Sequence, residues 1–180
     1  DLFTIYEKKG ELDGLTLAFL GDGNNVAHSL LLAASLTGMN FRIASPLGYA
    51  VQPRMLQLAQ DYAADSGAEI FCTEDPKLAV SGADIVYTDV WASMGQESEI
   101  QARRAVFADY QVNDRLLSLA RENAILMHDL PAHRGEEVSE DILDGPQSVV
   151  IDQAENKMYL LKALLAQMLG GLGMPLAGYH

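Results

Sequence analysis

Runs of hydrophobic residues alternate with stretches of helical periodicity along most of the chain. The run at 15–20, Leu-Thr-Leu-Ala-Phe-Leu, contains no charged residue, which is typical of a strand covered on both faces of a sheet. Similar runs predict further strands at 41–44, 70–73, 85–88 and 124–127, and a short sixth strand at 148–151. Helical spacing of apolar residues, bounded by capping and breaking residues, predicts helices at 25–36, 53–66, 75–82, 100–108, 114–122 and 152–169.

This alternation of strands and helices favours an α/β fold: a doubly wound, Rossmann-like parallel sheet of about five strands with helices on both faces. Because crossovers between parallel strands are right-handed, the carboxyl ends of the strands meet at one edge, where such sheets bind ligands. The leading segment at about 1–10 also has helical spacing, and no linker or repeat interrupts the chain. We therefore expect residues 1–180 to form a single domain.

The chain is strongly acidic, with 12 basic against 25 acidic residues and a net charge of −13. This charge repels phosphate backbones and anionic lipid, so we expect neither nucleic acid nor a membrane among its partners. The single cysteine, Cys72, cannot form an internal disulfide framework, and the four histidines lack the spacing of a zinc site. We expect no metal and a cytoplasmic location.

A glycine-rich loop, Gly-Asp-Gly-Asn-Asn-Val at 21–26, follows the first predicted strand in the position of a dinucleotide-binding fingerprint. Its third glycine position is Val26, and the second strand ends without an acidic residue for a ribose hydroxyl, which disfavours NAD. In a purely structural interpretation, the glycines form a tight turn and Asn25 caps the helix. One cap is sufficient, so the second amide is available to a small polar ligand.

Two more loops at the same edge carry ionisable residues. Asp89 follows the fourth strand, in Asp-Val-Trp-Ala-Ser-Met-Gly at 89–95, where a carboxylate can pair with a ligand ammonium and Ser93 lies in the same turn. His128 and Asp129 follow the fifth strand. The structural alternative is that Asp89 and Ser93 cap local helices and that His128 is a packed core residue. No Ser or Cys occupies a sharp strand-to-helix elbow, so the loops indicate a polar pocket for a small zwitterion and no nucleophilic triad.

Taken together, these loops resemble those of the ornithine carbamoyltransferases, and the resemblance covers nearly the whole chain. The motifs are the glycine loop at 21–25 with His28-Ser29, the segment at 89–95, His-Asp-Leu-Pro at 128–131 and Glu-Asn-Lys at 155–157, in the family's order and spacing. The resemblance implies attack of the δ-amine of L-ornithine on carbamoyl phosphate, which yields citrulline and phosphate. It implies no metal and no organic cofactor.

The resemblance also implies which residues contact each substrate. Those that would hold the α-amino and α-carboxylate groups of L-ornithine are Asn25, Asp89, Ser93 and, through its backbone, Met94. Those that would contact carbamoyl phosphate are Asp129, Leu130 and Lys157. Asp129 and Leu130 would also lie beside the reacting δ-amine, as catalytic residues.

Only the second half of the family's chain is represented. The phosphate-binding Ser-x-Arg-Thr-Arg motif of the first half is missing, and the chain starts without Met. We therefore expect a piece of a longer protein: an ornithine-binding domain with a leading interdomain segment at about 1–10 and a closing helix at about 152–169. The family's active unit is a homotrimer whose contacts lie mainly in the other half.

Two residues depart from the family pattern, both at the reaction centre. Asp129 stands where the family has Cys, and Lys157 stands where it commonly has Arg. A carboxylate at position 129 can accept a proton from the δ-ammonium, but it also stabilises the charged, unreactive amine. Two alternatives stay open: a non-catalytic amino-acid-binding or regulatory paralogue, which these departures motivate, and a carbamoyltransferase for a different amine.

Overall fold

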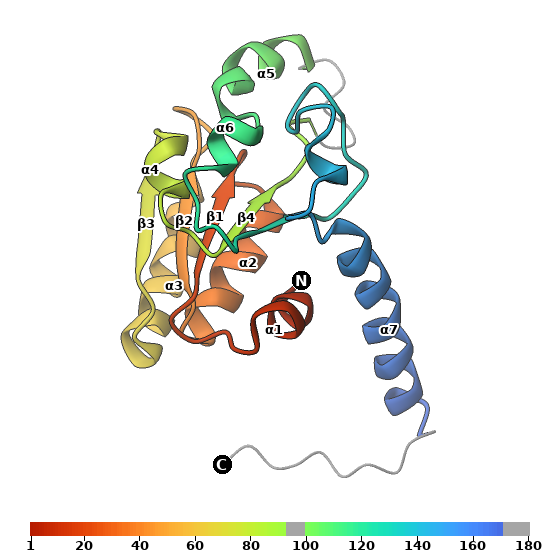
Figure 1. Cartoon of the computed structure of the whole chain (residues 1–180). Coiled ribbons are helices and arrows are strands. Elements are labelled where there is room, and N and C mark those ends of the chain that lie inside the picture. Colours follow the sequence, from red (N-terminus) through yellow and green to blue (C-terminus); the bar gives the residue numbers. More distant parts are fainter. Residues whose placement is uncertain (93–99, 171–180) are drawn as a thin grey trace.

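The chain forms one parallel sheet with helices packed on both faces. The computed structural model describes residues 1–92 and 100–170 (Figure 1). The sheet has the strand order β3-β2-β1-β4-β5, and every pairing is parallel. The strands are β1 (Thr16–Leu20), β2 (Asn40–Ala44), β3 (Ile70–Thr73), β4 (Ile85–Thr88) and β5 (Ile125–His128). This confirms the predicted doubly wound α/β fold.

The helices lie close to the segments where the sequence predicts them. They are α1 (Leu2–Lys9), α2 (Asn25–Leu36), α3 (Pro53–Ser66), α4 (Pro76–Val80), α5 (Ile100–Phe107), α6 (Asp114–Leu117) and α7 (Val150–Met168), with short 3-10 turns at Ala108–Tyr110 and Ile142–Asp144. The helix predicted at 114–122 ends early, at Leu117. The strand predicted at 148–151 is wrong. Ser148 makes only an isolated bridge to Leu126, and the backbone turns helical at Val150.

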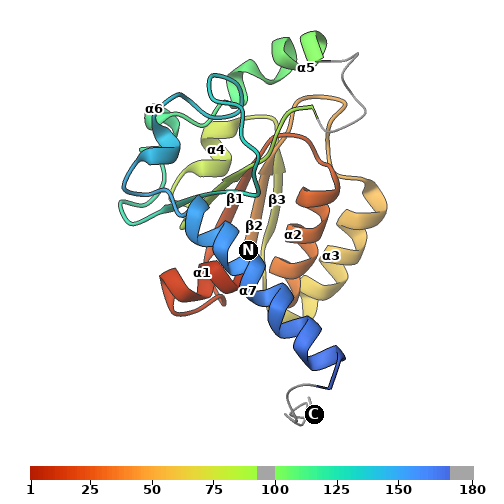
Figure 2. The same ribbon diagram turned by 90° about the vertical axis from the view of Figure 1, so that its right-hand side faces the viewer.

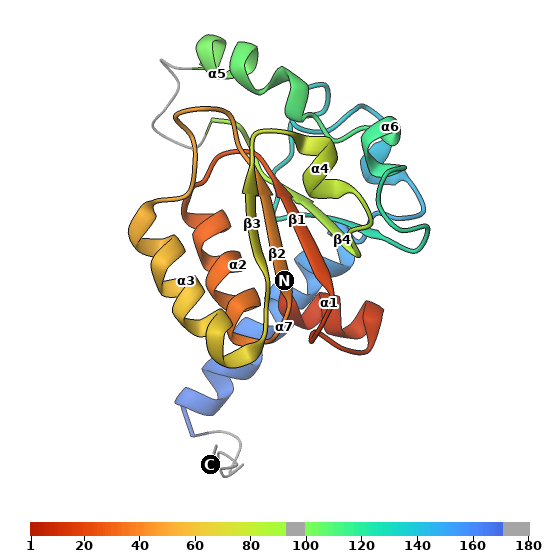
Figure 3. The ribbon, with the colours of Figure 1, turned by 90° about the vertical axis from the view of Figure 1, so that its left-hand side faces the viewer.

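Each face of the sheet has its own hydrophobic core, because successive side chains of a strand point to opposite faces. From β1, Leu17 and Phe19 pack with α1, α2 and α3, whereas Ala18 and Leu20 pack with α4, α5 and α6. Figures 2 and 3 show α2 and α3 on one side of the strands and α4 and α6 on the other. Because both faces are covered, ligands can reach the strands only at the edges of the sheet.

The closing helix α7 packs near its start and is exposed along the rest of its length. Val150 and Gln153 are buried, but large apolar side chains further along remain accessible to solvent. The final turns project away from the body of the domain (Figure 1). No helix in the described ranges is long and apolar enough to cross a membrane.

The glycine loop lies tightly against the loop that follows β2. The Gly23 amide donates to the Tyr49 carbonyl at 2.7 Å, and a Cβ at position 23 would lie 2.4 Å from the backbone nitrogen of Val51. Because that neighbour is backbone and cannot move aside, only glycine fits there. Gly21 has a φ of 143°, which also favours glycine. These two glycines hold the first residues of α2 at the carboxyl edge of the sheet.

Candidate functional site

Asn24 joins the glycine loop to the loop after β4. Its Oδ1 accepts hydrogen bonds from the amides of Val26 (2.9 Å) and Ala27 (3.1 Å), which makes Asn24 the N-cap of α2. Its Nδ2 donates to Asp89 Oδ2 at 2.9 Å. The interpretation in which Asn25 caps the helix is therefore wrong: the cap is Asn24, and Asn25 is the second, available amide.

Asp89 is held in place by two hydrogen bonds at the end of β4. The residue is 7% exposed, and while one oxygen accepts from Asn24, the other accepts from the Val90 amide at 2.7 Å. A carboxylate with a fixed orientation at the edge of a sheet is suited to binding a cationic group. Trp91 is buried and stacks on Phe107, with ring centroids 6.0 Å apart, so it is a packing residue.

His128, at the end of β5, is fully packed and its hydrogen bonds define its tautomer. Its Nδ1 accepts from the Leu130 amide at 2.9 Å, so the neutral ring carries its proton on Nε2. Nε2 faces Glu137 Oε1 at 3.3 Å and donates to it. His128 therefore confirms the packed, hydrogen-bonded interpretation, and it fixes the backbone that carries Asp129 and Leu130.

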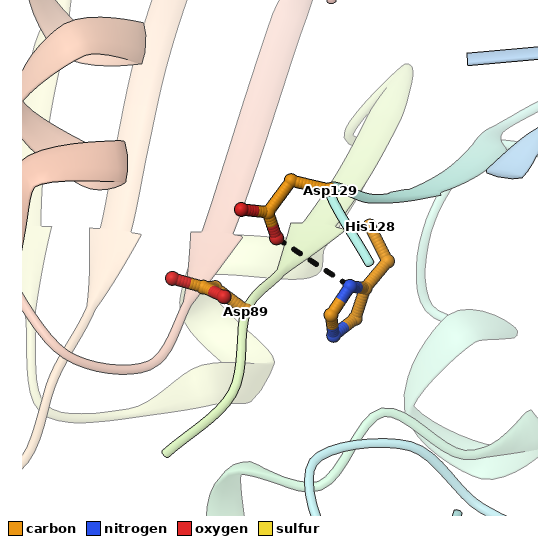
Figure 4. Close-up of side chains that lie close together, drawn as sticks. All are labelled: Asp89, His128 and Asp129. Atoms are coloured by element: carbon orange, nitrogen blue, oxygen red, sulfur yellow. Dashed lines mark ion pairs between the residues drawn. The ribbon is translucent and has the colours of Figure 1, made fainter. Parts of the chain in front are cut away.

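Asp129 lies close to both His128 and Asp89 (Figure 4). Its Oδ1 is 3.5 Å from His128 Nδ1, which already accepts the Leu130 amide, and it is buried without a hydrogen-bond partner among the described residues. Burial, together with the nearby carboxylate of Asp89, raises the pKa of Asp129 to about 6. The two aspartates thus form a pair of carboxylates that attracts a cation. Without a cation, full ionisation of both carboxylates is energetically unfavourable.

A cavity of about 270 Å³ opens beside Asp129, where the start of α2 and the first turns of α7 face each other. Its lining residues are Asp1, Phe3, Asn25, Val26, Ser29, Leu30, Asp129, Gln153, Ala154, Asn156, Lys157 and Leu160. The cavity brings together three of the predicted site residues: an amide at Asn25, a carboxylate at Asp129 and a cation at Lys157. Asp89 is not among these lining residues, but a carboxylate oxygen of Asp89 lies within 4.8 Å of one of Asp129.

Leu130 has an unusual backbone conformation. Its φ is 55°, in the left-handed region that residues with a Cβ rarely adopt, and the bond to Pro131 is cis. The conformation is supported by the bond from its amide to His128. Ser93 and Met94, which the sequence also assigns to this site, lie outside the described residues.

The structure adds two residues that the sequence analysis did not select. Gln153 of α7 accepts from the His128 amide at 3.0 Å and donates to the Tyr87 hydroxyl at 3.1 Å, so it ties α7 to β4 and β5. Arg103 of α5 pairs with Asp22 at 2.6 Å and donates to the Trp91 carbonyl at 2.9 Å. Neither residue has a distinguishing sequence signal, because Gln153 is one of several polar residues in the first turns of α7 and Arg103 is one of two adjacent arginines in α5.

Arg103 links three loops around the site. In addition to Asp22 and Trp91, its guanidinium lies over the Tyr49 ring, 4.9 Å from the centroid. These partners belong to the loops after β1, β4 and β2, and the arginine itself is 6% exposed. A buried arginine with several partners fixes the relative positions of those loops.

Comparison with known proteins identifies the family of the chain. Residues 13–168 match the family model described as aspartate/ornithine carbamoyltransferase, Asp/Orn binding domain. The chain is 50% identical to an ornithine carbamoyltransferase of Acidothermus cellulolyticus, over 97% of this chain and 57% of that protein. A relative of the same name from Thermococcus kodakarensis is also 50% identical, over 96% of this chain and 55% of that protein.

Solved structures give the same result. The ornithine carbamoyltransferase of Pyrococcus furiosus superposes with a TM-score of 0.90 at 48% identity, over 96% of this chain and 55% of that one. The protein of the same name from Gloeobacter violaceus superposes with a TM-score of 0.85 at 45% identity, over 92% of this chain and 55% of that one. The chain thus spans about half the length of the relatives that it matches. It belongs to the aspartate/ornithine carbamoyltransferase family and corresponds to that family's Asp/Orn-binding domain.

Proposed function

We propose that this chain is the L-ornithine-binding half of an ornithine carbamoyltransferase. The complete protein would transfer the carbamoyl group of carbamoyl phosphate to the ornithine δ-amine, giving citrulline and phosphate. The observation that carries the proposal is the cavity lined by Asn25, Asp129 and Lys157, with the carboxylate of Asp89 next to that of Asp129. An amide, a pair of carboxylates and a cation suit a substrate that has two ammonium groups and one carboxylate, and a second substrate that is an anion.

The α-end of ornithine is assigned to the loops after β1 and β4. In this proposal Asp89 accepts the α-ammonium, and Asn25 and Ser93, with the backbone of Met94, bind the remaining polar atoms. Asp89 is suited to this role because Asn24 and Val90 hold it rigidly, so little orientation entropy is lost on binding. Asn25 is suited because its neighbour Asn24 already caps the helix and its own side chain faces the cavity.

The δ-end is assigned to Asp129 and the backbone carbonyl of Leu130. The δ-nitrogen must lose a proton before it attacks the carbonyl carbon, and a second proton leaves as the new C–N bond forms and the C–O bond to phosphate breaks. One proton ends on phosphate and one is released. With a pKa of about 6, the Asp129 carboxylate is basic enough to take the first proton in a fraction of complexes near neutral pH. The reaction so described needs no metal and no organic cofactor.

Lys157 would contribute positive charge to the carbamoyl phosphate. It lines the same cavity from α7, one helical turn beyond the buried Gln153. A lysine acts as a point charge and lacks the two-pronged geometry of arginine, so it would attract the phosphate without fixing its orientation. The other half of the protein would supply the remaining phosphate contacts.

For the complete protein, we propose a cytoplasmic homotrimer that works in arginine biosynthesis. This assignment follows from the family resemblance, and the acidic composition supports a small-molecule enzyme without nucleic-acid or membrane partners.

Calorimetric titration of the chain with L-ornithine tests the proposal. We expect weak but measurable binding, because half of the cleft is contributed by the other domain, and weaker binding of L-aspartate and of putrescine. Aspartate lacks the δ-amine that faces Asp129, and putrescine lacks the α-carboxylate. Equal responses to ornithine and aspartate would contradict the assignment, and a preference for putrescine would identify a carbamoyltransferase for another amine.

The second candidate, a non-catalytic ornithine-binding protein, is favoured by Asp129 and Lys157. A citrulline assay of this domain, joined to the N-terminal half of an ornithine carbamoyltransferase, separates the two. Turnover at or above that of an Asp129→Cys version would exclude the non-catalytic function. Ornithine binding without turnover, restored by Asp129→Cys, would establish it.

A further inference from the structure

A second group of potential ligand atoms lies on the loop that follows Pro131, outside the cavity. One ligand atom each from His133, Glu136 and Glu137 lies within 4.8 Å of the other two. The Nδ1 of His133 is 3.9 Å from Oε2 of Glu137. The three residues are fixed in a compact turn, in which the Glu136 amide donates to the His133 carbonyl at 3.0 Å and the Gly135 amide donates to the Val138 carbonyl at 2.8 Å.

Glu137 is the unusual member of this group because it is completely buried. Its Oε1 accepts two hydrogen bonds, from the His133 amide at 2.5 Å and from His128 Nε2 at 3.3 Å. Its Oε2 is also buried and accepts none among the described residues, although it faces the imidazole of His133. A buried carboxylate oxygen without a partner is costly, so this atom points to a cationic ligand at its side.

We propose that His133, Glu136 and Glu137 bind a divalent first-row transition-metal ion, with Zn²⁺ as the ligand of best fit. One imidazole and two carboxylates form a donor set that such ions accept. Two bonds of about 2.0–2.2 Å bridge a separation of up to about 4 Å, so an ion can contact both His133 Nδ1 and Glu137 Oε2 with little rearrangement. The His133 side chain is 53% exposed, which leaves an open side for entry and for water.

Arg104 competes with the ion for Glu136. Its Nη2 pairs with Glu136 Oε1, and its side chain is 47% exposed, so the guanidinium can move into solvent. Removing this cation leaves Glu136 available and takes a positive charge away from the site. Arg104→Ala is therefore expected to strengthen metal binding.

The other three-residue group, formed by Asp89, His128 and Asp129, is less suited to a metal. Both oxygens of Asp89 already accept hydrogen bonds, and His128 Nδ1 accepts the Leu130 amide. Only Asp129 in that group has an oxygen without a partner in the described part of the chain. That group also belongs to the proposed ornithine site, whereas His133 and Glu136 do not line its cavity.

Titration of the chain with Zn²⁺ by calorimetry at pH 7.5, and with Co²⁺ by visible absorption, tests the metal site. We expect one ion per chain and Co²⁺ bands typical of four- or five-coordination. His133→Asn removes a ligand from an exposed position without touching the core and is expected to weaken Zn²⁺ binding by at least about tenfold. Arg104→Ala is expected to tighten it.

Two control variants are matched to the competing explanations. Asp129→Asn disrupts the other group, and His28→Asn removes a histidine on a different element, so neither is expected to change Zn²⁺ affinity. Absence of binding, unchanged affinity in His133→Asn, or loss of binding in Asp129→Asn would overturn the proposal. None of these outcomes depends on ornithine. The proposed metal site and the proposed function can therefore be refuted independently of each other.

Discussion

Ornithine affinity is expected to depend on the protonation of Asp129. Burial and the carboxylate of Asp89 raise the pKa of Asp129 from 3.8 to about 6. A change of pH from 7 to 5 therefore crosses this pKa and protonates most of the carboxylate. If the diamine cation binds the ionised form, affinity rises with pH through 6. Asp129 is about 90% ionised at pH 7 and about 10% at pH 5, so the apparent affinity falls about tenfold, which is ~1.4 kcal/mol. An aspartate with an ordinary pKa would stay almost fully ionised over this range.

Calorimetric titration with L-ornithine at half-unit pH steps measures this profile, and both ammonium groups of the ligand stay charged across it. The matched variant Asp129→Asn keeps the shape of the side chain but does not titrate, so its affinity is expected to be lower at pH 7 and nearly independent of pH. A flat profile for the unmodified chain, or an equally steep profile for Asp129→Asn, would refute the reasoning that Asp129 faces the ligand cation.

Five substitutions have further definite expected outcomes. At pH 7, Asp129→Asn should raise the free energy of unfolding by on the order of 1 kcal/mol in urea denaturation. The pKa of Asp129 is raised in the folded protein, so its ionisation destabilises the fold as pH rises from 4 to 6. A gain that persists at pH 4 would contradict this. Gly23→Ala should cost about 2–3 kcal/mol in the same assay because its Cβ meets the Val51 backbone; an unchanged midpoint would contradict it. Asn24→Ala should cost about 1 kcal/mol by loss of the α2 cap and should also weaken ornithine binding, whereas Asn25→Ala should weaken binding alone. Arg103→Lys should lower thermal stability and ornithine affinity together, since an ammonium lacks the planar guanidinium that lies over the Tyr49 ring while it pairs with Asp22; a shift in only one would refute a positioning role.

Most of the fold was predictable because apolar patterning decides it. The five strands and the helices that cover them have continuous or periodic hydrophobic runs, and Pro53 and Gly67 mark the start and end of α3 in the sequence. The error at 148–151 has a physical reason. Val149, Val150 and Ile151 form a β-branched run like that of a strand, but the segment enters α7, and only Ser148 bridges to β5.

The residues of the candidate site were predictable from the sequence, but the hydrogen bonds between them were not. Parallel topology brings the loops after β1, β4 and β5 to one edge, so the proximity of Asn25 and Asp129 follows from chain order. Which of two adjacent asparagines caps α2 depends on backbone angles that the residue types do not reveal. Histidine spacing gives no indication of Glu137, because it is an acidic residue in a charged segment of the sequence. Its burial results from the turn after Pro131, which no local pattern predicts.

In the proposed function, three loops at the carboxyl edge of the sheet bind one amino acid. A crystal structure of the chain grown with saturating L-ornithine tests this most directly. The ligand is expected in the cavity between α2 and α7, with its α-nitrogen at Asp89 and its δ-nitrogen beside Asp129. Ornithine bound instead at the other end of that edge, in the hollow lined by Ser45, Pro46 and Thr73, would contradict the claim.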